Sequence, residues 1–292
     1  MKILVLGSKG QLGQCLNDQL AITKNDVIYT DRKTIDICDF DATLAQILEL
    51  SPDIIINATA YTAVDKAEND HQAVDRINHL AVANLASICI QLECWLIHLS
   101  TDYVFDGCSM IPYKEDNLTN PQTYYGKSKL NGERVIQSSG CKYLILRTSW
   151  VFSEYGNNFL KTMLKLGSEN NELSVVDDQI GCPTYAQDIA RTIANIINLS
   201  NFKDLSSGIY HYCGDEPCTW YDFSRAIFLE AEVHGFKIPY NVKPIKTAEY
   251  PTPAIRPLYC VLDCTKIEFV FGIPRSNWRK GINSVIDRLI NS

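Results

Sequence analysis

The N-terminus carries the feature that most constrains the fold of this chain, a short apolar run that leads directly into a glycine-rich turn. The first six residues read MKILVL, and GSKGQLG follows with its three glycines spaced three residues apart. In such a turn the first glycine permits a tight bend, the second lets the backbone approach a pyrophosphate, and the third lets the next helix, expected over residues 14–20, pack on the strand. The turn therefore predicts a dinucleotide site in which these residues bind the cofactor: Gly7, Gly10, Gln11, Leu12 and Gly13.

Alternation of strands and helices over the first 150 residues predicts the fold class. Short β-branched apolar runs are separated by longer stretches of helical composition, which is typical of a parallel sheet built from βα units. Several runs are apolar on both faces, as expected for strands that helices cover on each side. We therefore predict an α/β protein with a Rossmann-like, doubly wound parallel sheet, whose first strands are residues 3–6, 26–30, 54–57, 95–100 and 143–147.

The composition changes after Trp150, where seven prolines fall between residues 183 and 257. Elements there should be brief and loops long, and loops over a rigid sheet commonly carry specificity. The chain shows no internal repeat and no linker. We expect residues 1–150 to form a dinucleotide-binding domain, with later returns of the chain, and residues 151–292 to form mainly a smaller α/β substrate-binding lobe that is interleaved with it.

Charged side chains at the end of the second predicted strand bear on the choice of cofactor. Asp31 stands where a carboxylate would accept hydrogen bonds from the adenosine ribose 2′-hydroxyl, which favours NADH. Arg32 and Lys33 follow at once and are able to hold the 2′-phosphate of NADPH. Asp36 and Ile37 are candidates for contact with the adenine edge, although a plain loop carboxylate explains Asp36 equally well. Both NADPH and NADH remain open from the sequence.

A tyrosine and a lysine four residues apart form the candidate catalytic pair. Tyr125 and Lys129 lie in residues 124–137, a segment of helical composition, and residues i and i+4 share a face of a helix. An ammonium beside the phenol is expected to lower the tyrosine pKa from its ordinary value of about 10. Thr101 follows the strand predicted over residues 95–100, at the edge where doubly wound sheets bind ligands. We predict that Thr101 hydrogen-bonds a carbonyl oxygen that Tyr125 protonates as hydride arrives from a nicotinamide.

Longer segments resemble the dTDP-4-dehydrorhamnose reductase family, part of the extended short-chain dehydrogenases, over nearly the whole length. The resemblance implies reduction by NADPH or NADH of the 4-keto group of dTDP-4-dehydro-L-rhamnose (dTDP-6-deoxy-L-lyxo-4-hexulose) to dTDP-L-rhamnose. The segments that carry it are GQLG at 10–13, NATAYTAVDKAE at 57–68, STDYVFDG at 100–107, YGK at 125–127, RTSWV at 147–151, GNNF at 156–159, DDQIGCPT at 177–184 and RP at 256–257.

The same resemblance implies roles for single residues. It makes Tyr125 the proton donor, lets Lys129 orient the nicotinamide ribose and tune Tyr125, and has Thr101 assist at the carbonyl. Asp102 and Trp150 would contact the sugar nucleotide, although a tryptophan after a strand is also often core. Three consecutive residues would line the cofactor, namely Ala60, Tyr61 and Thr62.

Arg256 is a candidate for the diphosphate of the nucleotide. It precedes Pro257 in a proline-rich loop, and a guanidinium matches the geometry of phosphate oxygens. A surface arginine is the other interpretation of this position.

The resemblance to this family also bears on metal binding and on the oligomeric state. Some relatives form dimers around Mg²⁺ held by carboxylates near the first helix and near the Gly-x-Pro-Thr segment, where this chain has Cys15 and Gln187. Mg²⁺ prefers carboxylate oxygen, so a bound metal is doubtful and we assign no metal ligand. The protein is expected to be a monomer or a homodimer.

Charge and composition exclude several classes of partner. The net charge is −7 and the five histidines are scattered, so no basic stripe is present for nucleic acid. No window offers the roughly 20 apolar residues of a membrane span. The eleven cysteines include no Cys-x-x-Cys pair, which favours reduced thiols in a cytoplasmic protein.

Two rival functions share this scaffold. One is a cofactor-binding partner without catalysis, like the regulatory subunit of methionine adenosyltransferase, and the other is another sugar-nucleotide reductase, epimerase or dehydratase. Thr101, Tyr125 and Lys129 together argue against the first, because a binding partner needs no proton donor. Dehydratases usually need a further acid and base beside the threonine, which Asp102 and Tyr103 do not supply.

Overall fold

A computed structural model describes residues 1–291 and contains a central sheet of six parallel strands in the order β10-β5-β4-β3-β1-β2. The predicted α/β, Rossmann-like architecture is confirmed. Each of the five predicted strands is present within one residue at either end, and the sixth comes from the second half of the chain. The strands are β1 (Lys2–Leu6), β2 (Asp26–Thr30), β3 (Ile54–Asn57), β4 (Trp95–Thr101), β5 (Lys142–Thr148) and β10 (Gly208–His211).

Helices cover both faces of this sheet, and the alternation of side chains along β1 shows why. Ile3 and Val5 point into one hydrophobic core, Leu4 and Leu6 into the other, and all four are fully buried. The first core is closed by α1 (Gln11–Leu20), α8 (Ala186–Ile197) and α10 (Thr265–Phe271). The second is closed by α2 (Phe40–Leu50), α5 (Ala81–Leu92) and α6 (Tyr124–Ser139).

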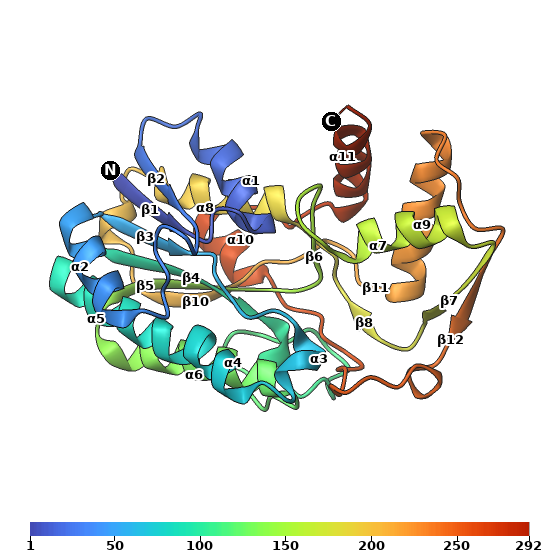
Figure 1. Cartoon of the computed structure of the whole chain (residues 1–292), viewed down its shortest axis with the longest axis horizontal. Coiled ribbons are helices and arrows are strands. Elements are labelled where there is room, and N and C mark those ends of the chain that lie inside the picture. The colour runs from blue at the N-terminus through green and yellow to red at the C-terminus, as the bar shows by residue number, and fades with distance from the viewer. Residues whose placement is uncertain (292) are drawn as a thin grey trace.

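A smaller lobe lies beside the sheet and has a core of its own around Phe223 and Trp278 (Figure 1). Its helices are α7 (Phe159–Glu169), α9 (Trp220–Val233) and α11 (Trp278–Ile290). Its strands form short pairs, namely β7 (Glu172–Val176) with β12 (Asn241–Ile245), β8 (Ile180–Gly181) with β11 (Cys218–Thr219), and β6 (Val151–Phe152) with β9 (Thr184–Tyr185). Between these pieces the chain returns to the large sheet as α8 and β10.

Short helical segments follow the carboxyl ends of β3 and β4. After β3 come α3 (Val64–Ala67), α4 (His71–Asp75) and the π-helix η1 (Arg76–Leu80), and after β4 comes the 3₁₀ turn η2 (Asp102–Val104). Two further 3₁₀ turns, η3 (Phe202–Asp204) and η4 (Thr247–Glu249), lie in the second half.

All eleven cysteines are free thiols. No helix within residues 1–291 combines the length and apolar character needed to cross a membrane.

Candidate active site

The glycine turn has the geometry expected of a dinucleotide loop. Gly7 adopts a φ of 82°, and a Cβ there would lie 2.9 Å from Thr59 Cγ2. A Cβ on Gly13 would lie 2.2 Å from the carbonyl oxygen of Gly7, so α1 is held close against the turn. Around Gly10 a Cβ would meet only that same oxygen, at 3.4 Å, which leaves its other side open to a ligand. Helix α1 begins at Gln11, three residues earlier than predicted, and offers its first N–H groups there.

The side chains of Gln11 and Leu12 point away from this open side. Gln11 Oε1 accepts hydrogen bonds from Ser153 Oγ at 3.0 Å and from Asn158 Nδ2 at 2.9 Å, so it ties the turn to the smaller lobe. Leu12 packs against the first core of the sheet. We therefore expect these two residues to contact a phosphate through their backbone N–H groups.

Charges at the end of β2 are largely paired with one another. Asp31 Oδ2 lies 2.5 Å from Lys9 Nζ, and its Oδ1 accepts from the backbone N–H of Lys33 at 2.8 Å. The hydrogen bond with Lys9 is the main reason that the pKa of Asp31 is lowered to about 2. Arg32 pairs with Asp36 at 3.3 Å and its side chain is 82% exposed. The carboxylate that favours NADH thus carries a cation beside it, and an exposed guanidinium lies next in the chain.

The segment after β3 is fixed by the buried Asn78 of the π-helix η1. Asn78 Oδ1 accepts from the backbone N–H of Tyr61 at 2.9 Å, and its Nδ2 donates to the Tyr61 carbonyl at 3.1 Å. The Tyr61 hydroxyl donates to Asp70 at 3.1 Å. Ala60 is half-buried and Thr62 is exposed. Ile37 is buried in the second core.

Helix α6 presents Tyr125 to the end of β4. Thr123 caps the helix by accepting from the backbone N–H of Gly126 at 3.0 Å. A Cβ on Gly126 would lie 2.2 Å from the Tyr103 carbonyl oxygen, so only glycine lets α6 approach η2 this closely. The Tyr125 phenol lies near the Thr101 side chain, which lowers the phenol pKa. Burial is the larger effect and raises the pKa of Tyr125 well above 10.0.

Lys129 shares the α6 face of Tyr125 but its Nζ atom points elsewhere. Lys129 is 2% exposed, and Nζ donates to the Leu99 carbonyl at 2.6 Å and lies 3.2 Å from His98 Nε2. Burial lowers the pKa of Lys129 to about 8. We expected Lys129 to lower the pKa of Tyr125, and that expectation is wrong in this structure, because Nζ is held by β4 and burial dominates at the phenol.

Asp102 lies directly beyond Thr101 and is 3% exposed. The Thr101 hydroxyl donates to Asp102 Oδ1 at 2.9 Å and accepts from the backbone N–H of Tyr103 at 3.2 Å. The other carboxylate oxygen, Oδ2, has no hydrogen-bond partner within the described residues. The Cys260 thiol and the Thr101 hydroxyl both lower the pKa of Asp102 by less than burial raises it. Burial raises the pKa of Asp102 to about 6.

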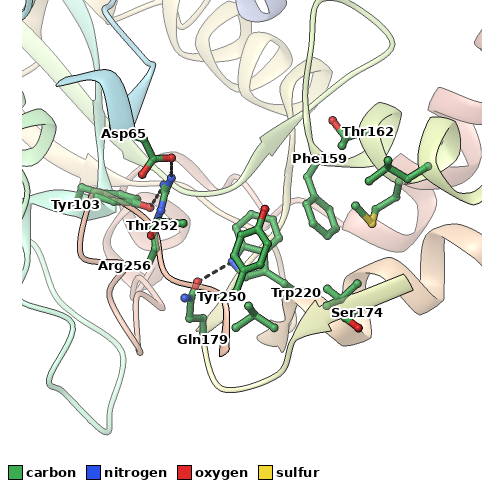
Figure 2. Close-up of a pocket in the computed structure, with 14 residues that line it drawn as sticks. Asp65, Tyr103, Phe159, Thr162, Ser174, Gln179, Trp220, Tyr250, Thr252 and Arg256 are labelled. Carbon is green, nitrogen blue, oxygen red and sulfur yellow. Dashed lines mark hydrogen bonds and ion pairs between the residues drawn. The ribbon is translucent and has the colours of Figure 1, made fainter. Parts of the chain in front are cut away.

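A cavity of about 480 Å³ opens between the sheet and the smaller lobe (Figure 2). One wall is aromatic, with Phe159, Trp220 and Tyr250, and Trp220 Nε1 donates to Gln179 Oε1 at 3.1 Å. The opposite wall carries Arg256. The lining also includes Asp65, Tyr103, Thr162, Met163, Leu166, Ser174, Val175, Val176 and Thr252.

Arg256 is held in place at this cavity by two partners. Its Nη2 lies 2.5 Å from Asp65 Oδ2, and its Nη1 donates to the Tyr103 hydroxyl at 2.9 Å. Asp65 Oδ1 also accepts from the backbone N–H of Ala254 at 3.2 Å. Arg256 is therefore a partly buried, paired arginine whose side chain lines the cavity.

Trp150 lies behind the aromatic wall. Its ring stacks on Trp220 with 3.5 Å between centroids and 9° between planes. A Cβ on Gly181 would lie 2.5 Å from the same ring. Trp150 adopts a φ of 46°, a left-handed conformation in which the chain turns out of β5. Of the two stacked indoles, Trp220 is the one that lines the cavity.

The residues at the family's metal positions do not fit Mg²⁺. Cys15 is fully buried, and the Gln187 amide donates to Asp18. The Arg288 guanidinium already binds both Asp18 and Glu154. An arginine cation therefore occupies the place beside these carboxylates, and within residues 1–291 no three or more His, Cys, Asp or Glu side chains gather as a metal site.

Comparison with known proteins agrees with this geometry. The family model described as the RmlD substrate binding domain matches residues 1–291. The dTDP-4-dehydrorhamnose reductase of Aggregatibacter actinomycetemcomitans is 43% identical over 97% of this chain and 98% of its own, and that of Escherichia coli K12 is 38% identical over 100% and 99%. This chain belongs to the dTDP-4-dehydrorhamnose reductase family.

Solved structures of family members have the same fold. The enzyme of Clostridium acetobutylicum superposes with a TM-score of 0.92 at 38% identity, covering 99% of this chain and 100% of its own. The Bacillus anthracis member, solved in complex with NADP, gives a TM-score of 0.91 at 34% identity and covers 98% and 99%. A UDP-glucose 4-epimerase from Thermus thermophilus shares the fold at 20% identity.

The sequence analysis missed several residues that build this site. Asn57, Asn78 and His98 are buried amides or rings whose partners lie on other elements. A polar residue inside an apolar strand, as at His98, is the signal that was available for one of them. Trp220 and Gln179 come together only through the pairing of β8 with β11.

Proposed function

We propose that this protein reduces the 4-keto group of dTDP-4-dehydro-L-rhamnose to dTDP-L-rhamnose, with NADPH or NADH as the hydride donor. The observation that carries this proposal is the Tyr125 phenol near Thr101 at the carboxyl end of β4, in a chain that matches a reductase family from end to end. When bound, the nicotinamide supplies hydride to the carbonyl carbon. The chain itself supplies the proton, the orientation and the shielding from water.

Tyr125 is suited to act as the acid. Because burial raises its pKa, the hydroxyl is protonated at neutral pH and has a proton to give to the carbonyl oxygen as the carbon accepts hydride. Thr101 lies between this phenol and Asp102, which fixes the direction of its hydroxyl. Lys129 reaches the same strand end from one turn further along α6 and would orient the nicotinamide ribose.

The cofactor is proposed to lie along the carboxyl ends of β1 to β4, over the domain of residues 1–150 with its returns α8 and β10. The open side of Gly10 and the start of α1 suit a pyrophosphate. Cations at the end of β2 suit a 2′-phosphate, whereas Asp31 suits a free 2′-hydroxyl. Further proposed contacts are Gly7, Gln11, Leu12, Gly13, Arg32, Asp36, Ile37, Ala60, Tyr61, Thr62, Tyr125 and Lys129.

The sugar nucleotide is proposed to occupy the cavity between the sheet and the smaller lobe. Its aromatic wall suits a pyrimidine base and Arg256 suits the diphosphate. Thr101 and Asp102 lie toward the sugar, and Trp150 supports the aromatic wall through Trp220. Residues 151–292 would therefore form most of the substrate-binding lobe.

Free thiols and a nucleotide-sugar substrate favour a cytoplasmic enzyme. An arginine in place of a bridging metal fits a monomer, and a homodimer without metal is the other arrangement. The mass measured by light scattering distinguishes the two, and a chelator should leave that mass unchanged.

The test is consumption of reduced cofactor with dTDP-4-keto sugars, with the product identified by mass and NMR. Tyr125→Phe should reduce kcat by about 10² to 10⁴ while the Kd for the cofactor stays near the wild-type value. Tyr124→Phe is the matched control, because the Tyr124 hydroxyl donates to Asp75 at 2.7 Å, away from Thr101. Wild-type turnover by Tyr125→Phe, or no consumption with any dTDP-keto sugar, contradicts the proposal.

A further inference from the structure

A chain of buried polar groups lies behind Lys129 and is not explained by the fold. Asn57 ends β3 and His98 lies beside it in β4, where the two residues are direct partners in the parallel register. Both are 0% exposed. Apolar side chains at these two positions would pack against the sheet without the free-energy cost of burying an amide and an imidazole. Their burial therefore indicates that Asn57 and His98 hold a neighbouring polar group in place.

The hydrogen bonds of these buried polar groups all donate in the same direction, from Thr59 through Asn57 and His98 toward Lys129. Asn57 Oδ1 accepts from the Thr59 backbone N–H at 3.1 Å and from the Thr59 hydroxyl at 2.5 Å. With its oxygen engaged, Asn57 turns its amide nitrogen to His98 Nδ1, at 3.1 Å. An amide NH₂ only donates, so Nδ1 must accept, and the single proton of a neutral imidazole is then on Nε2.

This tautomer has a consequence for Lys129. The Nε2–H of His98 faces Lys129 Nζ at 3.2 Å, and Nζ has already donated to the Leu99 carbonyl at 2.6 Å. An amine has a lone pair for the imidazole N–H, whereas an ammonium has none. An ammonium requires the other tautomer, with the proton on Nδ1 and the Asn57 amide turned over, so that Thr59 loses its acceptor.

The surrounding charges are few. Glu133, one turn further along α6, is the charged neighbour that favours the ammonium, and its carboxylate is bound by Arg147 of β5 and Ser100 of β4. His98 itself stays neutral, because burial and the nearby Lys129 lower its pKa well below 6.5. The imidazole thus changes its tautomer and not its charge.

We propose that Asn57 and His98 are positioning residues that hold Lys129 Nζ at the end of β4 and couple the charge of Lys129 to the tautomer of His98. When Lys129 takes up a proton from solvent, the proton of His98 moves from Nε2 to Nδ1 and Asn57 reverses its amide. The functional meaning of this coupling rests on the proposed role of Lys129 at the nicotinamide ribose, but the coupling itself does not.

The first experiment follows the tautomer of His98 by ¹⁵N NMR over roughly pH 6 to 10, with the resonance assigned by His98→Gln. The tautomer should change with the same midpoint as the titration of Lys129 Nζ, and Lys129→Met should abolish the change. A tautomer that stays constant over this range overturns the proposal. Because no substrate is used, the outcome is independent of whether the protein is a reductase.

The second experiment uses Asn57→Asp to reverse the hydrogen bond between residue 57 and His98. A carboxylate only accepts, so it should fix the proton on Nδ1, favour the ammonium and raise the Lys129 midpoint by about one pH unit or more. The midpoint is measured by NMR and by the pH dependence of the NADPH Kd. Asn84→Asp is the matched control, since Asn84 of α5 bonds the Phe40 carbonyl and not His98 or Lys129. Equal midpoints in the two variants overturn the proposal.

Discussion

The buried carboxyl of Asp102 determines how the Thr101 hydroxyl is hydrogen-bonded. Its Oδ1 accepts a hydrogen bond from the Thr101 hydroxyl, and its other oxygen has no hydrogen-bond partner within the described residues. While Asp102 is ionised, the Thr101 hydroxyl points at it and offers its lone pairs to Tyr125. Protonation of Asp102 would free that hydroxyl to turn toward a carbonyl. The hydrogen bonding of Thr101 is therefore expected to depend on the charge of its neighbour.

We predict that Asp102→Asn increases stability at alkaline pH. The folded-state pKa of Asp102 is about 6, above the ordinary 3.8, so the stability it contributes is present below about pH 4 and is lost as the pH rises through 6. The full loss is about 3 kcal/mol. Urea unfolding should show the variant more stable than wild type by up to this amount at about pH 8, and by about half of it at about pH 5. A difference that is equal at the two pH values would show that ionisation is not the cause.

The candidate catalytic residues were predictable one by one, but their electrostatics were not. Tyr125, Lys129 and Thr101 follow from spacing and strand position, and the structure brings all three to the end of β4. The direction in which Nζ points depends on the carbonyl of Leu99 and the ring of His98, which no local pattern encodes. For the same reason the pKa of Tyr125 was expected to fall and is instead raised by burial.

At the scale of elements, α6 is anchored to the sheet by a buried ion pair. Arg147 of β5 binds Glu133 of α6 through Nε–Oε1 at 2.9 Å and Nη2–Oε2 at 2.6 Å, and the side chains are 3% and 0% exposed. Ser100 of β4 donates to the same carboxylate at 2.5 Å. Three elements of the site are therefore fixed relative to one another through Glu133.

Breaking this pair on one side should be costly. Arg147→Met is expected to lower the free energy of unfolding by about 3 to 5 kcal/mol, because it leaves the Glu133 carboxylate buried without its cation. The double variant Arg147→Met with Glu133→Leu should recover most of that loss. Arg32→Met is the control, since its exposed pair with Asp36 should contribute less than about 1 kcal/mol. Equal losses in the single and double variants would contradict this account, and urea unfolding measures all of them.

Long elements were predicted well because their signal is local. The five predicted strands are apolar runs bounded by polar or glycine residues, and they match β1 to β5 closely. The two-residue strands β6, β8, β9 and β11 exist only through their pairing with distant segments. The π-helix η1 likewise depends on Asn78, whose hydrogen bonds reach Tyr61 and Ser128.

At the scale of the whole molecule, side chains of α1 and α11 join the sheet to the smaller lobe. Arg288 of α11 binds Asp18 of α1 at 3.0 Å and also binds Glu154, which follows β6. The Tyr155 hydroxyl donates to Asp18 at 3.0 Å, and the Tyr185 hydroxyl donates to Glu154 at 3.2 Å. This Arg288 cluster, together with Gln11, fixes the two walls of the cavity.

We predict that Arg288→Met destabilises the protein by about 1 to 3 kcal/mol, since Glu154 is 8% exposed and would lose its cation. Denaturant unfolding followed by tryptophan fluorescence, which reports mainly on the smaller lobe, measures the effect. Arg279→Met on the same helix is the control, because its ion pair with Glu216 is more than half exposed on both sides. Equal stability of the two variants would argue against a joining role for Arg288. Added Mg²⁺ should not restore the loss.

The pairing of Arg256 with Asp65 and Tyr103 has a consequence for selection among ligands. Any anion that reaches this guanidinium must compete with a carboxylate already seated on it. A doubly charged diphosphate brings enough charge to win that exchange, whereas an uncharged sugar or a nucleoside brings none. Asp65 thus neutralises the Arg256 guanidinium, and we expect this position to select ligands by their charge.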